Sequence, residues 1–324
     1  MRGAVQMTRI DLRETAKILS ESDNILLLAH SHPDGDTMGS NTALAHALKA
    51  MGKRVAVKCG DRIPADFDFM FEGLDNEEFE PDLIVAVDVA DNKLLGNEFD
   101  GIYGDRVDLC IDHHGSNIGY AEKLWLEGES ASAAEMIFAL INELGCPITP
   151  IMASAIFTGV STDTGCFRFS NTTARTHLIA AELIKLGADT QPIILKFFET
   201  KTKTYAALEK LALESMRTYF DDRCAVITVT QAMYKRSGSD ESETDRLANL
   251  PRQVEGVLVG VTMRELRDGS FKASVRTHGD IDASEICARL GGGGHAGAAG
   301  CTLYGNQREA TNTLLNEIKA QLDS

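Results

Sequence analysis

The sequence predicts an α/β protein: an N-terminal domain built on a parallel sheet with helices on both faces, and a smaller α/β C-terminal domain across a cleft from it. Three observations predict this. Four apolar runs early in the chain are continuous rather than alternating, as expected for strands that are buried on both faces. Helical patterns lie between or after these runs. The chain has 324 residues, which exceeds the usual size of a single core, so two domains are expected.

The elements follow from these patterns in chain order. The apolar runs predict strands at 24–30, 54–60, 82–88 and 107–112. Helical periodicity predicts helices at 38–51, 130–144, 150–161 and 173–187. A charged helical stretch at 203–220 precedes new strands at 224–230, 256–266 and 271–278. We therefore expect a first domain over 1–200, a helical linker over 201–221 and a second domain over 222–324.

Composition limits the class of protein. Apolar residues make up 44% of the chain and charged residues 25%, as in ordinary globular proteins, and no window approaches the length of apolar sequence that a membrane span needs. The first residues carry charge throughout, unlike a secretion signal. We expect a cytoplasmic protein that does not bind membranes.

Charge and cysteine usage narrow the partners. A formal net charge of −16 argues against long duplex nucleic acid, because that binding depends on many Lys and Arg contacts to phosphates. Binding of short anionic ligands is still compatible with this net charge. The seven cysteines are scattered and never spaced C-x-x-C, so neither a disulfide framework nor a thiolate zinc site is indicated.

Histidines and aspartates cluster where the predicted strands end. The stretch "AHSHPDGDTMGS" (29–40) supplies His30, His32, Asp34 and Asp36 in a tight turn that leads into a helix. "VAVDVAD" supplies Asp88 and Asp91 after the third strand, and "CIDHHGSN" supplies Asp112, His113 and His114 after the fourth. "STDTG" adds Asp163 at a helix end. In open α/β sheets the carboxyl edge of the strands is where ligands bind, so these side chains are expected to meet there.

These ligand types predict two divalent metal ions. Carboxylates combined with imidazoles, without thiolates, suit Mn²⁺ first, with Mg²⁺, Co²⁺, Fe²⁺ and Zn²⁺ as alternatives. Two such ions about 3.5 to 4 Å apart can clamp the attacking and leaving oxygens of a phosphoryl displacement. For His32 an ordinary loop position fits equally well.

The set resembles the DHH family of phosphoesterases, which is named for the tripeptide Asp112-His113-His114. The four motifs "HSHPDGD", "VDVAD", "DHH" and "STDTG" stand in the family's order. The resemblance implies that His114 faces the scissile phosphate and that Asp112 orients a histidine. It implies His30, Asp34 and Asp88 on one metal, and Asp36, Asp88, His113 and Asp163 on the other, with Asp88 bridging.

A glycine-rich stretch, "ARLGGGGHAGAAG" (288–300), predicts a phosphate site in the second domain. Its backbone N–H groups can approach an anion closely, above all at Gly292, Gly293 and Gly294, with His295 as a further donor. It resembles the signature of the domain that often follows the DHH domain, and that resemblance implies that Arg276 and His295 hold a substrate phosphate or the terminal nucleotide. Arg168 in "CFRFSN" is a further candidate for phosphate contact.

The resemblance covers roughly residues 8–320, and in length it is most similar to the compact nanoRNase (NrnA-type) class of the family. That class hydrolyses short RNA oligomers to 5'-mononucleotides and also acts as a 3'-phosphoadenosine-5'-phosphate phosphatase. The expected partners are therefore short single-stranded RNA or nucleoside bisphosphates. Phosphodiesterase activity on linear or cyclic dinucleotides (pApA, cyclic di-AMP), manganese pyrophosphatase activity and non-catalytic nucleotide sensing are the alternatives. The oligomeric state stays open, a homodimer included.

Overall fold

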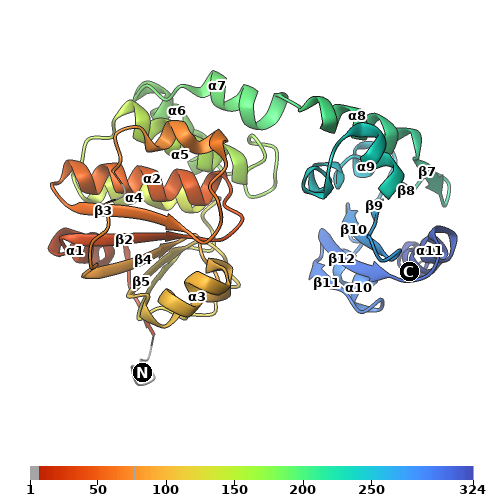
Figure 1. Ribbon diagram of the computed structural model, residues 1–324, viewed down its shortest axis with the longest axis horizontal. Helices are drawn as coiled ribbons and strands as arrows, with labels where there is room; N and C mark the ends of the chain where they lie inside the picture. The colour runs from red at the N-terminus through yellow and green to blue at the C-terminus, as the bar shows by residue number, and fades with distance from the viewer. Residues whose placement is uncertain (1–6, 76, 324) are drawn as a thin grey trace. The chain divides into compact units, whose positions relative to one another are not determined.

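The computed structural model describes residues 7–75 and 77–323; residues 1–6 of the charged N-terminal stretch lie outside the described residues. The chain divides into two compact units, Met1–Thr200 and Lys201–Ser324, and each unit has its own six-stranded sheet (Figure 1). No helix in the described part of the chain is long and apolar enough to cross a bilayer. The predicted α/β class with a parallel N-terminal sheet is confirmed.

The sheet of the first unit is parallel throughout, with the strand order β1-β6-β5-β4-β2-β3. The four predicted strands are present, and two short strands are added at one side of the sheet. In chain order the six are β1 (Thr8–Arg9), β2 (Asn24–Ala29), β3 (Arg54–Cys59), β4 (Leu83–Val87), β5 (Leu109–Asp112) and β6 (Lys123–Leu126). From β2 the chain proceeds to β3 on one side and to β4 and β5 on the other. The sheet therefore has a switch point between β2 and β4, where α/β proteins bind ligands.

Helices cover both faces of this sheet, which explains why the central strands β2 and β4 are apolar at nearly every position. Ile25 and Leu27 of β2 pack under α2, α4 and α5, whereas Leu26 and Leu28 pack on the opposite face around Leu95, near α3 (Figure 1). The helices of the first unit are α1 (Leu12–Glu21), α2 (Gly35–Ala50), α3 (Asn97–Tyr103), α4 (Ala133–Glu143), α5 (Pro150–Asp163), α6 (Ala174–Lys185) and α7 (Thr190–Ile194), with shorter helical segments η1 (Ala65–Phe71), η2 (Asn92–Leu95), η3 (Gly104–Arg106) and η4 (Leu195–Glu199).

Helices α2 and α5 approach each other closely because glycines lie at their contact. A Cβ atom on Gly39 would stand 2.2 Å from the carbonyl oxygen of Ala155, and a Cβ on Gly159 would stand 2.8 Å from Oδ1 of Asp36. Any larger side chain at either position would push the helices apart. This contact brings the first turn of α2 beside the last turn of α5, and so brings Asp36 toward Asp163.

The second unit is a mixed sheet with the order β11-β12-β10-β9-β8-β7, in which only β8 and β9 pair in parallel. The predicted linker region, 201–221, holds α8 and β7, and Leu208 of α8 packs on Ile227 within this unit. The elements are α8 (Lys203–Glu214), β7 (Arg217–Tyr219), β8 (Cys224–Val229), α9 (Gln231–Ser237), η5 (Glu241–Glu243), η6 (Asp245–Leu247), η7 (Pro251–Gln253), β9 (Val259–Glu265), β10 (Phe271–Thr277), α10 (Ala283–Ala288), β11 (Gly293–His295), β12 (Ala298–Leu303) and α11 (Gln307–Leu322).

Candidate metal centre and active site

The carboxyl edge of the first sheet gathers the predicted metal ligands. His30 follows β2, Asp88 follows β4 and His113 follows β5, while Asp36 lies in the first turn of α2 and Asp163 ends α5. Their ligand atoms form three groups, each with all atoms within 4.8 Å of one another: His30, Asp34 and Asp88; Asp36, His113 and Asp163; and Asp88, His113 and His114.

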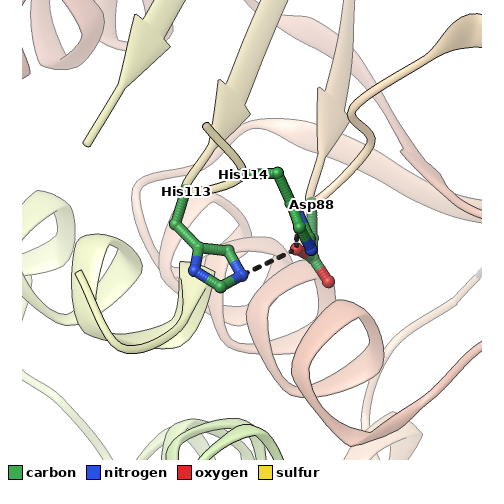
Figure 2. Close-up of side chains that lie close together, drawn as sticks. All are labelled: Asp88, His113 and His114. Carbon is green, nitrogen blue, oxygen red and sulfur yellow. Dashed lines mark ion pairs between the residues drawn. The ribbon is translucent and has the colours of Figure 1, made fainter. Parts of the chain in front are cut away.

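Asp88 belongs to two of these groups, and it also lies close to His113 of the third. Its Oδ2 is 3.8 Å from Nε2 of His30. Its Oδ1 is 3.5 Å from Nε2 of His113, as Figure 2 shows. On the first side, Nε2 of His30 is also 3.7 Å from Asp34. On the second side, Nε2 of His113 is 3.7 Å from Asp36 and 3.5 Å from Asp163. One carboxylate therefore offers an oxygen to each of two neighbouring sets of ligands.

Backbone contacts aim both imidazoles into this space. Nδ1–H of His30 donates to the carbonyl oxygen of Ser31 at 2.8 Å, and Nδ1–H of His113 donates to that of Ser130 at 3.1 Å. Since a carbonyl oxygen only accepts, the proton of each neutral ring lies on Nδ1 and the lone pair on Nε2. Each histidine thus presents the nitrogen that a metal ion binds.

Hydrogen bonds from backbone N–H groups hold Asp34 and Asp36 in place. Asp36 accepts hydrogen bonds from the backbone N–H groups of Ala133 (2.7 Å) and Ala134 (2.9 Å) at the start of α4. Asp34 caps α2 by accepting from the N–H groups of Asp36 and Thr37, both at 3.0 Å. Asp88 has a left-handed backbone, with φ of 64°, which non-glycine residues rarely adopt and which aspartate tolerates better than most.

Unsatisfied buried atoms show that these residues fit metal ions. Oδ1 of Asp88 and Nε2 of His113 are buried and have no hydrogen-bond partner among the described residues. Within the same residues, no Lys or Arg lies within ion-pairing distance of Asp36, Asp88 or Asp163. Buried charges and polar atoms are normally paired, because leaving them unpaired costs free energy. Cations with oxygen and imidazole ligands would satisfy this set.

Burial and mutual repulsion both raise the pKa values of the carboxyl groups at this site. Burial, followed by the negative charge of Asp163, raises the pKa of Asp36 to about 7. Burial, followed by the charge of Asp34, raises the pKa of Asp163 to about 6. The pKa of Asp88 is also raised well above its usual value by burial and by the neighbouring carboxylates. This group of carboxyl groups therefore disfavours full ionisation unless cations balance its charge.

These shifts predict an unusual pH dependence for the metal-free protein. Asp36 and Asp163 hold protons in the folded state up to about pH 7 and 6, whereas in the unfolded chain they release them near pH 4. The folded state thus binds more protons between pH 4 and 7, so these groups lower stability as pH rises through that window. With chelator present, we expect a higher melting temperature at pH 5.5 than at pH 7.5, and a smaller difference with Mn²⁺. A chelated protein more stable at pH 7.5 would contradict this.

Within the tripeptide Asp112-His113-His114, the aspartate orients the two histidines through hydrogen bonds. Oδ1 of Asp112 accepts from Nδ1–H of His114 at 2.8 Å and from the backbone N–H groups of His113 (2.8 Å) and His114 (3.2 Å). The hydrogen bond to Asp112 raises the pKa of His114. Because Asp112 occupies Nδ1 and the side chain of His114 is 45% exposed, Nε2 is the nitrogen of His114 left for a ligand.

Asn117 completes this arrangement and was missed in the sequence analysis. Its Nδ2–H donates to Oδ2 of Asp112 at 2.7 Å, and its Oδ1 accepts from the N–H of Gly119 at 2.8 Å. The order of contacts is Asn117 to Asp112 to His114. Asparagine is a common residue in turns, so its presence after "DHHGS" did not indicate this role.

Replacing Asn117 with alanine should weaken catalysis without removing metal. Asp112 would lose a hydrogen bond that holds its carboxylate beside His114, and losing such outer partners typically costs about 10- to 100-fold in activity. We expect kcat to fall in that range with little change in KM. Asn142→Ala, which removes a single bond to the carbonyl oxygen of Phe138, is the control and should be silent. An unchanged kcat in Asn117→Ala would show that catalysis does not depend on the hydrogen bond from Asn117 to Asp112.

Other residues singled out from the sequence lie elsewhere. Asp91 accepts from the N–H of Lys93 at the start of η2, and the side chain of His32, 92% exposed, lies 3.4 Å from Asp61. Neither belongs to the three groups of ligands. Arg168 is exposed in the turn after Asp163.

In the second unit the structure aligns two predicted phosphate contacts. Arg276 of β10 pairs with Ala298 of β12, and Ala298 pairs in turn with His295 of β11. Directly paired residues project from the same face of a sheet, so Arg276 and His295 flank a small alanine in one row. Gly292 and Gly294 are required for close strand approach: a Cβ on Gly294 would stand 2.5 Å from Cα of Ala299.

Both units of the chain match known protein families. Residues 24–160 match the DHH family, N-terminal domain, and residues 223–323 match the DHHA1 domain. The chain is 31% identical to the bifunctional oligoribonuclease and PAP phosphatase NrnA of Thermus thermophilus, over 96% of this chain and 94% of that protein. It is 26% identical to the protein of the same name from Bacillus subtilis, over 90% and 93%. The crystal structure of an exopolyphosphatase-related protein from Bacteroides fragilis matches with a TM-score of 0.86 and 25% identity, over 95% of both chains.

Proposed function

The chain belongs to the DHH family of metal-dependent phosphoesterases, and from this premise we propose that it hydrolyses short oligoribonucleotides to 5'-mononucleotides in the cytoplasm and removes the 3'-phosphate of 3'-phosphoadenosine-5'-phosphate. The relatives from Thermus thermophilus and Bacillus subtilis, whose names state both activities, match this chain over nearly all of its length and theirs. Both substrates contain a phosphate ester on a ribonucleotide, so one centre can serve both.

The position of Asp88 is the observation that carries the proposal. With one oxygen toward His30 and the other toward His113, it fits the bridging ligand of two divalent ions, for which we propose Mn²⁺ first. His30, Asp34 and Asp88 would hold one ion; Asp36, Asp88, His113 and Asp163 would hold the other. When bound, such a pair polarises the phosphoryl group and makes a water molecule nucleophilic near neutral pH.

The chain's own residues supply orientation and charge. Asp112 holds His114 so that Nε2 is free to donate to a non-bridging phosphate oxygen, where negative charge develops in the transition state. The raised pKa of His114 favours the protonated ring that this donation needs. The amides of Ala133 and Ala134 keep Asp36 in place throughout the reaction, so little reorganisation is required.

We further propose that the second unit binds a substrate phosphate. The row of Arg276, Ala298 and His295 offers a guanidinium and an imidazole on one face of its sheet, and Gly293 and Gly294 beside it are exposed. The N–H of Gly292 instead donates to the carbonyl oxygen of Cys287 at 2.8 Å. In this proposal residues 1–200 are catalytic, 201–221 link, and 222–324 bind substrate. A phosphate anchor combined with a net charge of −16 favours short substrates over long nucleic acid.

Replacing Arg276 should weaken substrate binding more than chemistry. Loss of a guanidinium that contacts phosphate removes a charge-assisted hydrogen bond, so Arg276→Ala should raise KM for a dinucleotide by about 10-fold or more with a smaller change in kcat. Arg267, 90% exposed and in the same unit, is the matched control. Equal KM values for Arg276→Ala and Arg267→Ala would remove Arg276 from the substrate site.

A substrate panel tests the proposal as a whole. With Mn²⁺ present, we expect mononucleotides from pApA and from RNAs of two to five nucleotides, little product from a 24-nucleotide RNA, and AMP from 3'-phosphoadenosine-5'-phosphate. Cleavage of cyclic di-AMP and pApA alone would make the chain a dinucleotide phosphodiesterase. Cleavage of pyrophosphate alone would overturn the role of the second unit, and no cleavage of any substrate would favour a nucleotide-sensing protein.

A further inference from the structure

The turn that follows Asp163 has an unusual backbone. Gly165, Cys166 and Phe167 are consecutive left-handed residues with φ of 56°, 59° and 63°. A left-handed conformation is unfavourable for cysteine and phenylalanine, and such residues cluster at functional sites. The turn is closed by hydrogen bonds from the N–H groups of Arg168 (2.9 Å) and Phe169 (3.0 Å) to the carbonyl oxygen of Thr164.

This backbone sends the two phenylalanines of the turn to different environments. Phe167 packs inward, with its ring 5.3 Å from that of His177 and 6.0 Å from that of Phe157. Phe169 stays 46% exposed. Its ring lies against the backbone of Gly165, where a Cβ atom would stand 2.4 Å from Cζ of the ring. One side of the Phe169 ring is therefore supported by the turn, while much of its surface faces solvent.

The turn is fixed to the candidate metal centre. Nδ2–H of Asn171 donates both to the carbonyl oxygen of Asp163 (3.2 Å) and to that of Ala131 (3.0 Å), two residues before the amide that binds Asp36. Consecutive Cα atoms are about 3.8 Å apart, so Gly165 lies at most about 8 Å from Asp163. The ring of Phe169 thus rests on a backbone segment that lies at most about 8 Å from the Cα of a proposed metal ligand.

Arg168 adds a cation beside the ring. Its Nε donates to the carbonyl oxygen of Gly165 at 2.5 Å. In the described part of the chain, its two terminal nitrogens make no hydrogen bond or ion pair. An exposed arginine whose guanidinium is held through Nε alone suits a phosphate oxygen. An aromatic face with a neighbouring cation is the combination by which proteins bind single-stranded nucleic acid.

We propose that Phe169 stacks on the nucleobase next to the scissile phosphate, and that Arg168 contacts the phosphate attached to that nucleoside. The inference deepens the proposed function, on which it rests, by giving the catalytic unit a base-binding site of its own. Stacking is tolerant of base identity, because every base has a π-face. The site would therefore select nucleotides over other phosphate esters without selecting a sequence.

Fluorescence of 2-aminopurine tests the stacking without turnover. Two non-hydrolysable dinucleotides with a methylene-phosphonate linkage would carry 2-aminopurine at the first or the second position. With wild-type protein, one of the two should show quenching on binding. Phe169→Leu should lose that quenching and Phe169→Trp should retain it, while Leu178→Ala, which alters a 72% exposed leucine on α6, should match wild type. Equal quenching in wild type and Phe169→Leu, or none in wild type, would overturn the proposal.

Kinetics on abasic substrates separate this inference from the proposed function. Phe169→Leu should lower kcat/KM for pApA between about 5- and 150-fold, the amount that one stacked base contributes. The same variant should match wild type on a dinucleotide that is abasic at the stacked position. Equal losses on both substrates would make Phe169 merely structural. Failure of wild-type protein to cleave any dinucleotide would instead overturn the proposed function, whatever the fluorescence shows.

Discussion

Asp88→Asn should lower kcat/KM on short RNA by about 10³-fold or more, the largest loss we expect from any single substitution. The substitution removes a negative charge that both sets of ligands share, and metal ions supply several kcal/mol of transition-state stabilisation in such centres. Asparagine has the same shape and also tolerates the left-handed backbone at this position.

The fold should survive this substitution. Burial and neighbouring carboxylates disfavour the charged form of Asp88, so a neutral side chain relieves repulsion in the metal-free protein. Its melting temperature in chelator should equal or exceed that of wild type. Asp91→Asn is the matched control: it lies in the same "VDVAD" motif but only caps η2, and its activity should stay within about twofold of wild type. Near-normal activity in Asp88→Asn would refute the shared role.

The second largest effect is expected for His114→Ala, which should lower kcat by about 10²- to 10³-fold. The substitution removes the imidazole that we propose donates from Nε2 to the phosphate while Asp112 holds its Nδ1, and in this proposal His114 is not one of the metal ligands. Metal content should therefore equal that of wild type. His113→Ala should lower both kcat and metal content.

His32→Ala is the matched control for His114→Ala. The side chain of His32 is 92% exposed and contacts only Asp61 among the described acidic residues, so its removal should leave kcat unchanged. A loss of metal together with activity in His114→Ala would show that His114 is a ligand. An equal loss in His32→Ala would return His32 to the candidate site.

The sequence sufficed for much of this fold because the strong signals are local. The strands at 24–29 and 83–87 are buried on both faces and are apolar at every position after Asn24, so they could be located to within a residue or two. Their carboxyl ends meet at one edge in a parallel sheet, which is why residues 58 positions apart, His30 and Asp88, could be expected together. β1 consists of two polar residues, and the apolar part of β6 is only Leu124, Trp125 and Leu126, so neither strand was located.

The parts of the candidate site that could not be predicted are of two kinds. Backbone groups, such as the amides that hold Asp36 and the carbonyl of Ser130 that orients His113, have no sequence signature. The roles of ordinary polar and aromatic residues depend on their three-dimensional position. Asn117 is identified only by its hydrogen bond to Asp112, and Phe169 only by the contact of its ring with Gly165 in the turn after Asp163.

Counting metal ions per chain tests the central claim most directly. The protein would be stripped with chelator, equilibrated with Mn²⁺ by dialysis and analysed for bound metal, with electron paramagnetic resonance as a measure of coupling between ions. We predict two Mn²⁺ per wild-type chain with a magnetically coupled spectrum, and loss of the coupling and of at least one ion in Asp88→Asn. A single ion per wild-type chain, or two coupled ions retained in Asp88→Asn, would contradict the shared carboxylate on which the account rests.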